Sequence, residues 1–130
     1  MSKLKVAVAI DSKGDITQTH FGDCKTIVFA EISEEGYTVL ERTRNLLRQD
    51  NDGDHGDLRK LKTARDLLHE VCILVAGRMS PNFKKLRLQD GKMPVISTQS
   101  MAQTLEYLTA NLSRVVAHFE NPDNIYLKIG

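Results

Sequence analysis

An imidazole and a thiol lie four residues apart in the segment Thr19-His20-Phe21-Gly22-Asp23-Cys24, shortly before an apolar run at residues 26–32. Imidazole and thiolate groups are preferred ligands of borderline and soft metals, and a loop at the end of a sheet leaves coordination positions open. His20 and Cys24 are therefore candidate ligands of a metal or cluster. The structural alternative is that His20 hydrogen-bonds the backbone, Gly22 supplies a positive φ angle and Cys24 packs as a small apolar residue.

A further histidine, His55, lies in an acidic loop at residues 50–57. The connection from Arg44 to Asp57 has about fourteen residues and is longer than most connections, which is typical of a functional or a mobile loop. His55 is thus a candidate third ligand, and a solvated loop is the alternative. The glycines and charges of the loop also predict high mobility in the absence of ligand.

Basic residues outnumber acidic ones between residues 78 and 92. The segment has one acidic residue, Asp90, and five basic residues, Arg78, Lys84, Lys85, Arg87 and Lys92. Ser80-Pro81 supplies an N-cap and a first-turn proline for a short helix, and a helix N-terminus attracts anions. The segment suits an anionic ligand such as a cluster bearing carboxylates, and a solvated charged face is the alternative.

Five runs of the sequence predict strands. Two are apolar throughout, as is typical of strands buried on both faces, whereas residues 37–43 alternate like a half-exposed edge strand. The five runs are Val6–Ile10, Thr26–Ile32, Tyr37–Thr43, Val71–Ala76 and Met93–Ile96. Helical spacing and capping signals predict helices over residues 57–68, 81–88 and 101–112.

This order of elements predicts an α/β fold with a mixed five-stranded sheet, strand order 3-2-1-4-5 along the chain, and helices on both faces. The first and fourth strands are then parallel central neighbours, and a ligand crevice opens beyond their ends. The loop of residues 11–25, beginning at Asp11, and the turn from Gly77 to Ser80 border that crevice. Residues 1–110 form the predicted domain. Residues 111–130 are a C-terminal extension that fits the pattern less cleanly, with a helix toward Phe119 and a short strand at 125–129 as its expected elements.

The composition is that of one ordinary globular domain. The chain has 130 residues, of which 41% are hydrophobic and 27% charged, and a formal net charge of +1. That charge supplies no general attraction to a polyanion, so nucleic acid is not an expected partner. The apolar run ending at Ile10 is too short for a membrane helix or a signal peptide, and Cys24 and Cys72 are too few for a disulfide framework. We expect a cytoplasmic protein without membrane attachment, with Cys72 as a packing thiol.

A series of short features resembles one known family. The features follow one another in this order: a strand ending at Asp11, a loop closing on His20-Phe21-Gly22, an apolar strand, the turn Glu35-Gly36-Tyr37, a His-containing loop and a strand ending Val75-Ala76-Gly77-Arg78. In this order they resemble the dinitrogenase iron-molybdenum cofactor biosynthesis family over about residues 4–110. The chain departs from the glycine-rich turn of that family at Met79-Ser80-Pro81-Asn82-Phe83.

The resemblance implies a ribonuclease-H-like motif and reversible binding of an iron-sulfur cluster, or of the iron-molybdenum cofactor or a precursor. Together with the expected crevice, it predicts a site in which His20, Cys24 and His55 are the candidate metal ligands. The predicted cofactor-binding residues are Asp11, His20, Phe21, Gly22, Gly77, Arg78 and Ser80.

The expected function is that of a non-catalytic carrier in metallocluster assembly, a monomer or weak homodimer with other assembly proteins as partners. A two-metal nuclease needs several converging carboxylates, and the run Val71–Ala76 adds none to Asp11. The chain also has neither a Gly-x-Ser-x-Gly elbow nor a phosphate-binding Gly-x-x-x-x-Gly-Lys-Ser loop. The alternatives are a ligand-free regulatory or interaction module on the same fold and, less favoured, a ribonuclease-H-like hydrolase.

Overall fold

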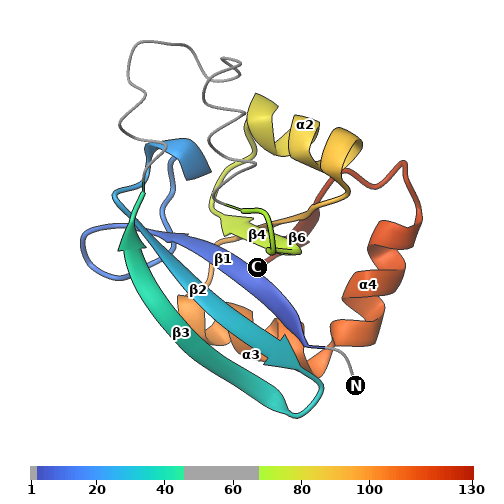
Figure 1. Cartoon of the computed structure of the whole chain (residues 1–130), viewed down its shortest axis with the longest axis horizontal. Coiled ribbons are helices and arrows are strands. Elements are labelled where there is room, and N and C mark those ends of the chain that lie inside the picture. The colour runs from blue at the N-terminus through green and yellow to red at the C-terminus, as the bar shows by residue number, and fades with distance from the viewer. Residues whose placement is uncertain (1–2, 46–67) are drawn as a thin grey trace.

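The computed structural model describes residues 3–45 and 68–130 (Figure 1). Three expectations lie outside these ranges: the helix at 57–68 except for its last residue, the acidic loop at 50–57, and His55 within that loop. Every structural statement below refers to the described ranges.

A single mixed sheet of six strands forms the centre of the described part, in the order β3-β2-β1-β4-β5-β6. Strands β1, β2 and β3 form an antiparallel meander, and β4, β5 and β6 continue the sheet from β1 in parallel. The strands are β1 Leu4–Ile10, β2 Thr26–Ser33, β3 Gly36–Arg44, β4 Ile73–Ala76, β5 Met93–Ser97 and β6 Leu127–Ile129. The expected order of the first five strands is confirmed, and the count of five is wrong. The short strand expected at 125–129 is present as the three residues of β6, and it joins the sheet beside β5 as its sixth strand.

The two apolar runs occupy the centre of the sheet, as expected. β1 pairs with β4 in parallel, with Val6 opposite Ile73 and Val8 opposite Val75. Because successive side chains point to opposite faces, β1 contributes Val6 and Val8 to one apolar core and Ala7 to the other. Strands buried on both faces have no polar side and therefore read as continuous apolar runs.

In the part of the chain that the structure describes, three α-helices cover the two faces, so the expectation of helices on both faces is confirmed (Figure 1). α2, Pro81–Asp90, begins where Ser80 Oγ accepts a hydrogen bond from the Phe83 amide at 3.2 Å, and it ends at Gly91, whose φ is 70°. α3, Met101–Ala110, begins with a capping box formed by Ser100 and Gln103. α3 and α4, Leu112–Glu120, pack on the face opposite to α2.

The C-terminal residues complete this architecture. Val115 and Phe119 of α4 and Ile129 of β6 belong to the core on the α3 side of the sheet. The Arg87 guanidinium of α2 donates to the carbonyl of Phe119 at 2.6 Å and to that of Asn124 at 3.1 Å, and it lies 4.9 Å from the centre of the Phe119 ring. Arg87 therefore ties together helices that lie on opposite faces.

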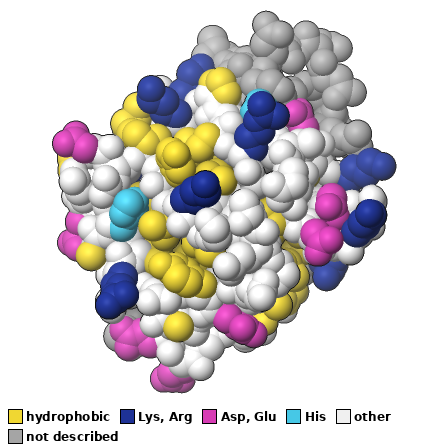
Figure 2. Space-filling model, turned by 180° about the vertical axis from the view of Figure 1, so that it is seen from behind, with side chains coloured by type: hydrophobic (Ala, Val, Ile, Leu, Met, Phe, Trp, Pro, Cys, Tyr) yellow, Lys and Arg dark blue, Asp and Glu magenta, His cyan; other side chains and the backbone are white. Residues whose placement is uncertain are grey.

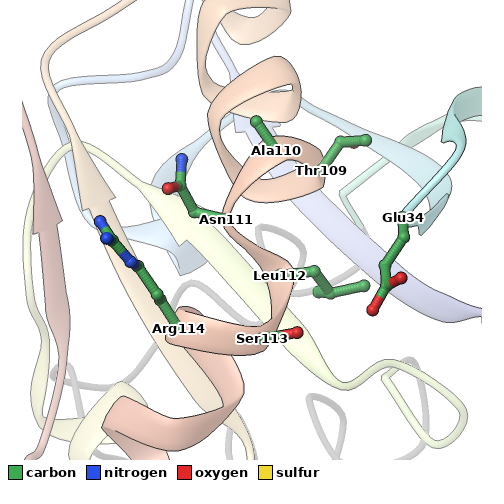
Figure 3. A pocket seen from close by; sticks show the side chains of 7 residues that line it. All are labelled: Glu34, Thr109, Ala110, Asn111, Leu112, Ser113 and Arg114. Carbon is green, nitrogen blue, oxygen red and sulfur yellow. The ribbon is translucent and has the colours of Figure 1, made fainter.

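Charged side chains of both signs are interspersed with apolar ones on the face shown in Figure 2. In the described ranges, no helix is long and apolar enough to cross a membrane. A surface hollow of about 550 Å³ lies where α3 meets α4, lined by Glu34 and residues 109–114 (Figure 3). None of the predicted site residues lines this hollow.

Candidate functional site

Two loops meet beyond the carboxyl ends of β1 and β4, at the position expected for a ligand crevice. His20 forms an isolated parallel β-bridge with Arg78, and the Gly77 amide donates to the Thr17 carbonyl at 2.8 Å. The prediction that the 11–25 loop adjoins the Gly77–Ser80 turn is therefore confirmed. The cause is topological, because neighbouring parallel strands release their following loops at the same edge of a sheet.

Gly77 allows this close approach of the two backbones. A Cβ atom at this position would overlap the Thr17 carbonyl oxygen and lie 2.8 Å from Nε2 of Gln18. A clash with a backbone atom is not relieved by rotating a side chain. Gly77 thus contributes to the site by having no side chain, which lets the two loops pack against each other.

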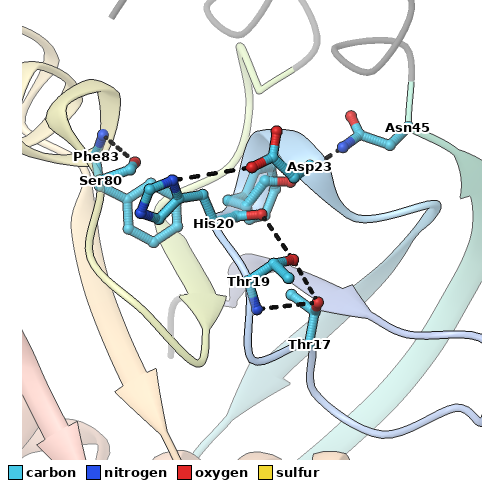
Figure 4. Close-up of polar contacts among 8 residues, drawn as sticks. Thr17, Thr19, His20, Asp23, Asn45, Ser80 and Phe83 are labelled. Carbon is cyan, nitrogen blue, oxygen red and sulfur yellow. Dashed lines mark hydrogen bonds and ion pairs between the residues drawn. The ribbon is translucent and has the colours of Figure 1, made fainter. Parts of the chain in front are cut away.

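His20 immediately precedes the short 3-10 helix η1, Phe21–Asp23, and its side chain is 19% exposed (Figure 4). Its Nδ1 atom lies 3.9 Å from Oδ2 of Asp23, and the Asp23 amide donates to the His20 carbonyl at 3.0 Å. The imidazole is thus held in a tight turn while part of it remains open to solvent. These are the properties required of a ligand that binds an incoming group.

Phe21 anchors the loop in the core on the α2 side. Its ring is buried, with its centre 5.3 Å from that of Phe83 at an interplanar angle of 45°. The small side chains of Ala7, Ala9 and Ala76 in the same cluster leave room for these rings. Phe21 therefore fixes the position of its neighbour His20, whereas its own ring faces the interior.

The backbone conformation of Gly22 differs from the one given in the structural alternative. Within the described ranges, the glycines with positive φ are Gly14, Gly36, Gly91 and Gly130, so the alternative in which Gly22 supplies a positive φ is wrong. A Cβ atom at Gly22 would have no heavy atom of another segment within 4 Å. The fold does not require a glycine here, and the missing side chain leaves the surface next to His20 uncovered.

Cys24 is buried and hydrogen-bonded inside the protein. Its Sγ donates to the Thr26 carbonyl at 3.3 Å and accepts a bond from Nδ2 of Asn45 at 3.4 Å. Loss of hydration on burial raises the pKa of the Cys24 thiol to about 11, and the hydrogen bond from Asn45 offsets part of this shift. Because the thiolate is the form that binds metals, this geometry favours the packing interpretation of Cys24.

Asn45, a residue that the sequence analysis did not single out, holds the loop that carries His20. It is fully buried at the end of β3, and its Nδ2 donates to the carbonyls of Phe21 and Cys24, both at 3.0 Å. Its only sequence signal is an asparagine after an edge strand, which normally indicates a turn. Its partners lie 24 and 21 residues away, so local patterns could not identify them.

The side chains of Asp11 and Ser80 stabilise their own segments. Asp11 Oδ1 accepts the amides of Lys13 at 2.8 Å and Asp15 at 3.1 Å, which closes the turn after β1, and Ser80 caps α2. Arg78 is exposed beside His20. Of the predicted residues, the structure therefore brings His20 and Arg78 together through the β-bridge, with Gly22 following in the His20 turn and Gly77 packed against Thr17.

The donor set of the described part is small. Within these ranges, no group of three or more His, Cys, Asp or Glu side chains is arranged to hold a metal ion. His118 lies on α4, where its Nε2 hydrogen-bonds the Tyr126 carbonyl at 3.0 Å. Cys72 is partly buried against the core on the α3 side, as expected for a packing thiol. His20 is thus the best placed of the predicted ligands that the structure describes.

A comparison with protein-family models decides the family. The model of the dinitrogenase iron-molybdenum cofactor family matches residues 3–120. The chain belongs to this family. No curated protein matches the chain. The matched residues contain both loops of the site, and membership in the dinitrogenase iron-molybdenum cofactor family associates the protein with biosynthesis or binding of that cofactor, in the context of nitrogen fixation.

Proposed function

We propose that this protein binds an iron-sulfur cluster, or the iron-molybdenum cofactor or a precursor, and carries it between metallocluster-assembly proteins, with His20 as the ligand from the protein. The observation that carries the proposal is the position of His20. Its imidazole lies partly exposed where the loops after two central parallel strands meet, in a chain of the iron-molybdenum cofactor family.

A site with few protein ligands suits a carrier, because cargo that must be released cannot be fully coordinated by its carrier. An imidazole is a suitable ligand for iron and for other borderline metals. The uncovered backbone at Gly22 allows a bulky cluster to approach His20. The remaining coordination positions of the cargo are then filled by its own ligands, by solvent, by thiols in solution or by the receiving protein.

The positive charge of Arg78, next to His20, favours anionic cargo. Arg78 is exposed and adjoins His20 through the β-bridge, and the N-terminus of α2 begins two residues later at Ser80. An arginine near the positive end of a helix attracts carboxylates and other anions. Clusters with thiolate or carboxylate ligands carry such negative charge.

Anaerobic titration of the apoprotein tests the proposal. A synthetic thiolate-ligated iron-sulfur cluster and, in a parallel series, isolated iron-molybdenum cofactor are added while visible absorbance is recorded. His20→Ala should weaken binding by roughly tenfold or more, because a metal ligand is lost. His118→Ala is the matched control, since it removes a histidine that bonds the backbone elsewhere, and it should bind like the wild type. Cys24→Ala should also retain binding.

Equal uptake by wild type and His20→Ala would show that His20 is not the ligand. If the wild type took up neither cargo, the ligand-free interaction module would become the better description. Molybdenum, iron and sulfide measured per chain after anaerobic purification would identify which cargo the protein carries.

A further inference from the structure

The carboxylate of Asp23 lies next to one ring nitrogen of His20, Nδ1, with Oδ2 at 3.9 Å. We propose that Asp23 is a positioning residue, which holds the imidazole proton on Nδ1 of His20 and so leaves Nε2 to bind the metal of the cargo. This inference rests on the proposed function and adds to it a residue that neither the sequence analysis nor the family resemblance assigned.

The geometry of the turn brings the two side chains together. His20 is the residue before η1 and Asp23 is the last residue of η1, so the turn of this short helix separates them by three positions. Nδ1 and Oδ2 are 3.9 Å apart, as the dashed line between them in Figure 4 marks. The Asp23 side chain is 38% exposed, and an approach of about 1 Å would bring the two atoms to hydrogen-bond distance.

Neighbouring residues hold this turn in place. Asn45 binds the carbonyls of Phe21 and Cys24, on either side of Gly22 and Asp23, and the Phe21 ring is fixed against Phe83. The backbone that carries His20 and Asp23 is therefore fixed at several points. Within it, the choice of tautomer depends on the group that faces Nδ1.

The chemistry of imidazole gives the pair its effect. A neutral imidazole carries one proton, so the nitrogen without it is the one that can bind a metal. A carboxylate next to Nδ1 accepts a hydrogen bond from the protonated form of that atom and stabilises the tautomer in which Nε2 carries the lone pair. Histidines that bind metals usually donate their second nitrogen to such a partner, which also fixes the orientation of the ring.

Nitrogen-15 spectra of the imidazole in the apoprotein test the inference without any cargo. They are recorded at a pH at which the spectrum itself shows His20 to be neutral. In the wild type, we expect the proton on Nδ1. Asp23→Ala should shift the population toward the tautomer protonated at Nε2, and Asp23→Glu should restore part of the wild-type pattern. Glu35→Ala, which removes an exposed carboxylate at the β2–β3 turn, should leave the His20 signals unchanged.

Cluster titration of the same variants supplies the second measurement. Asp23→Ala should weaken binding of the synthetic iron-sulfur cluster roughly 10- to 100-fold, the usual effect of removing such a partner. Asp23→Asn keeps the shape of the side chain and an oxygen acceptor, and it should fall between wild type and Asp23→Ala. Thermal unfolding verifies that each variant is folded.

The two proposals fail in different ways. Equal binding by His20→Ala and wild type would refute the proposed function. If His20→Ala loses binding but Asp23→Ala keeps the wild-type tautomer, His20 is a ligand and the role of Asp23 is refuted. A changed tautomer with unchanged affinity would also refute the positioning role.

Discussion

Replacing Asn45 should destabilise the protein more than any exposed substitution, because this side chain hydrogen-bonds two buried carbonyls. In Asn45→Ala, the carbonyls of Cys24 and Phe21 both lose their bonds from Nδ2, and the described residues leave the Phe21 carbonyl a long 3.4 Å bond from the Cys24 amide. A buried acceptor left without a donor costs about 1–3 kcal/mol, and a lost hydrogen bond about 0.5–1.5 kcal/mol. The expected loss is therefore about 2–4 kcal/mol, a large part of the roughly 5–15 kcal/mol typical of a domain.

Urea unfolding measures this loss as a lower midpoint with an unchanged slope. Asn124→Ala is the matched control, because Asn124 is less buried and its Nδ2 donates to one carbonyl, that of His118, at 2.8 Å. It should lose about 1 kcal/mol. Asn45→Asp preserves the shape of the side chain but turns a carboxylate toward the two carbonyls, so it should cost more than Asn45→Ala.

The effect of Asn45→Ala should be concentrated in the loop that carries His20. Amide hydrogen exchange should accelerate for residues 20–25 more than for β1 or β4, because the Asn45 bonds hold that turn specifically. A loss of stability in Asn45→Ala no larger than in Asn124→Ala would refute the reasoning. So would an acceleration of exchange spread evenly over the sheet.

Two further outcomes follow from the loop. Gly77→Ala should lower the free energy of unfolding by about 1–3 kcal/mol, because its Cβ overlaps the Thr17 carbonyl. Gly22→Ala places its Cβ in open space and should unfold at the wild-type urea midpoint. Equal midpoints for the two variants would contradict this expectation. The raised pKa of Cys24 means that the unfolded chain loses its thiol proton first, so stability is fully present below the ordinary pKa of 9.0 and declines as the pH rises toward about 11. At about 1.4 kcal/mol per pH unit, the wild type should lose about 1.4 kcal/mol relative to Cys24→Ala by about pH 10, and parallel pH profiles of the two proteins would exclude this contribution.

The central architecture could be read from the sequence because its signals are local. Strands buried on both faces must be apolar throughout, which identified β1 and β4, and the capping residues Ser80 and Ser100 marked the starts of α2 and α3. Connection rules then placed the loops after β1 and β4 side by side, which brought His20 to the edge of the sheet next to Arg78.

What the sequence could not determine depends on contacts between distant residues. It identified Cys24 and Gly22 by type, but whether a thiol is buried or a glycine is required depends on the atoms that other segments place around it. Gly77 is the sterically required glycine because Thr17 crosses it, and Cys24 is buried because Asn45 and the core close over it. Hydrophobic periodicity records which face a side chain occupies, and only the assembled tertiary structure decides which distant group meets it there.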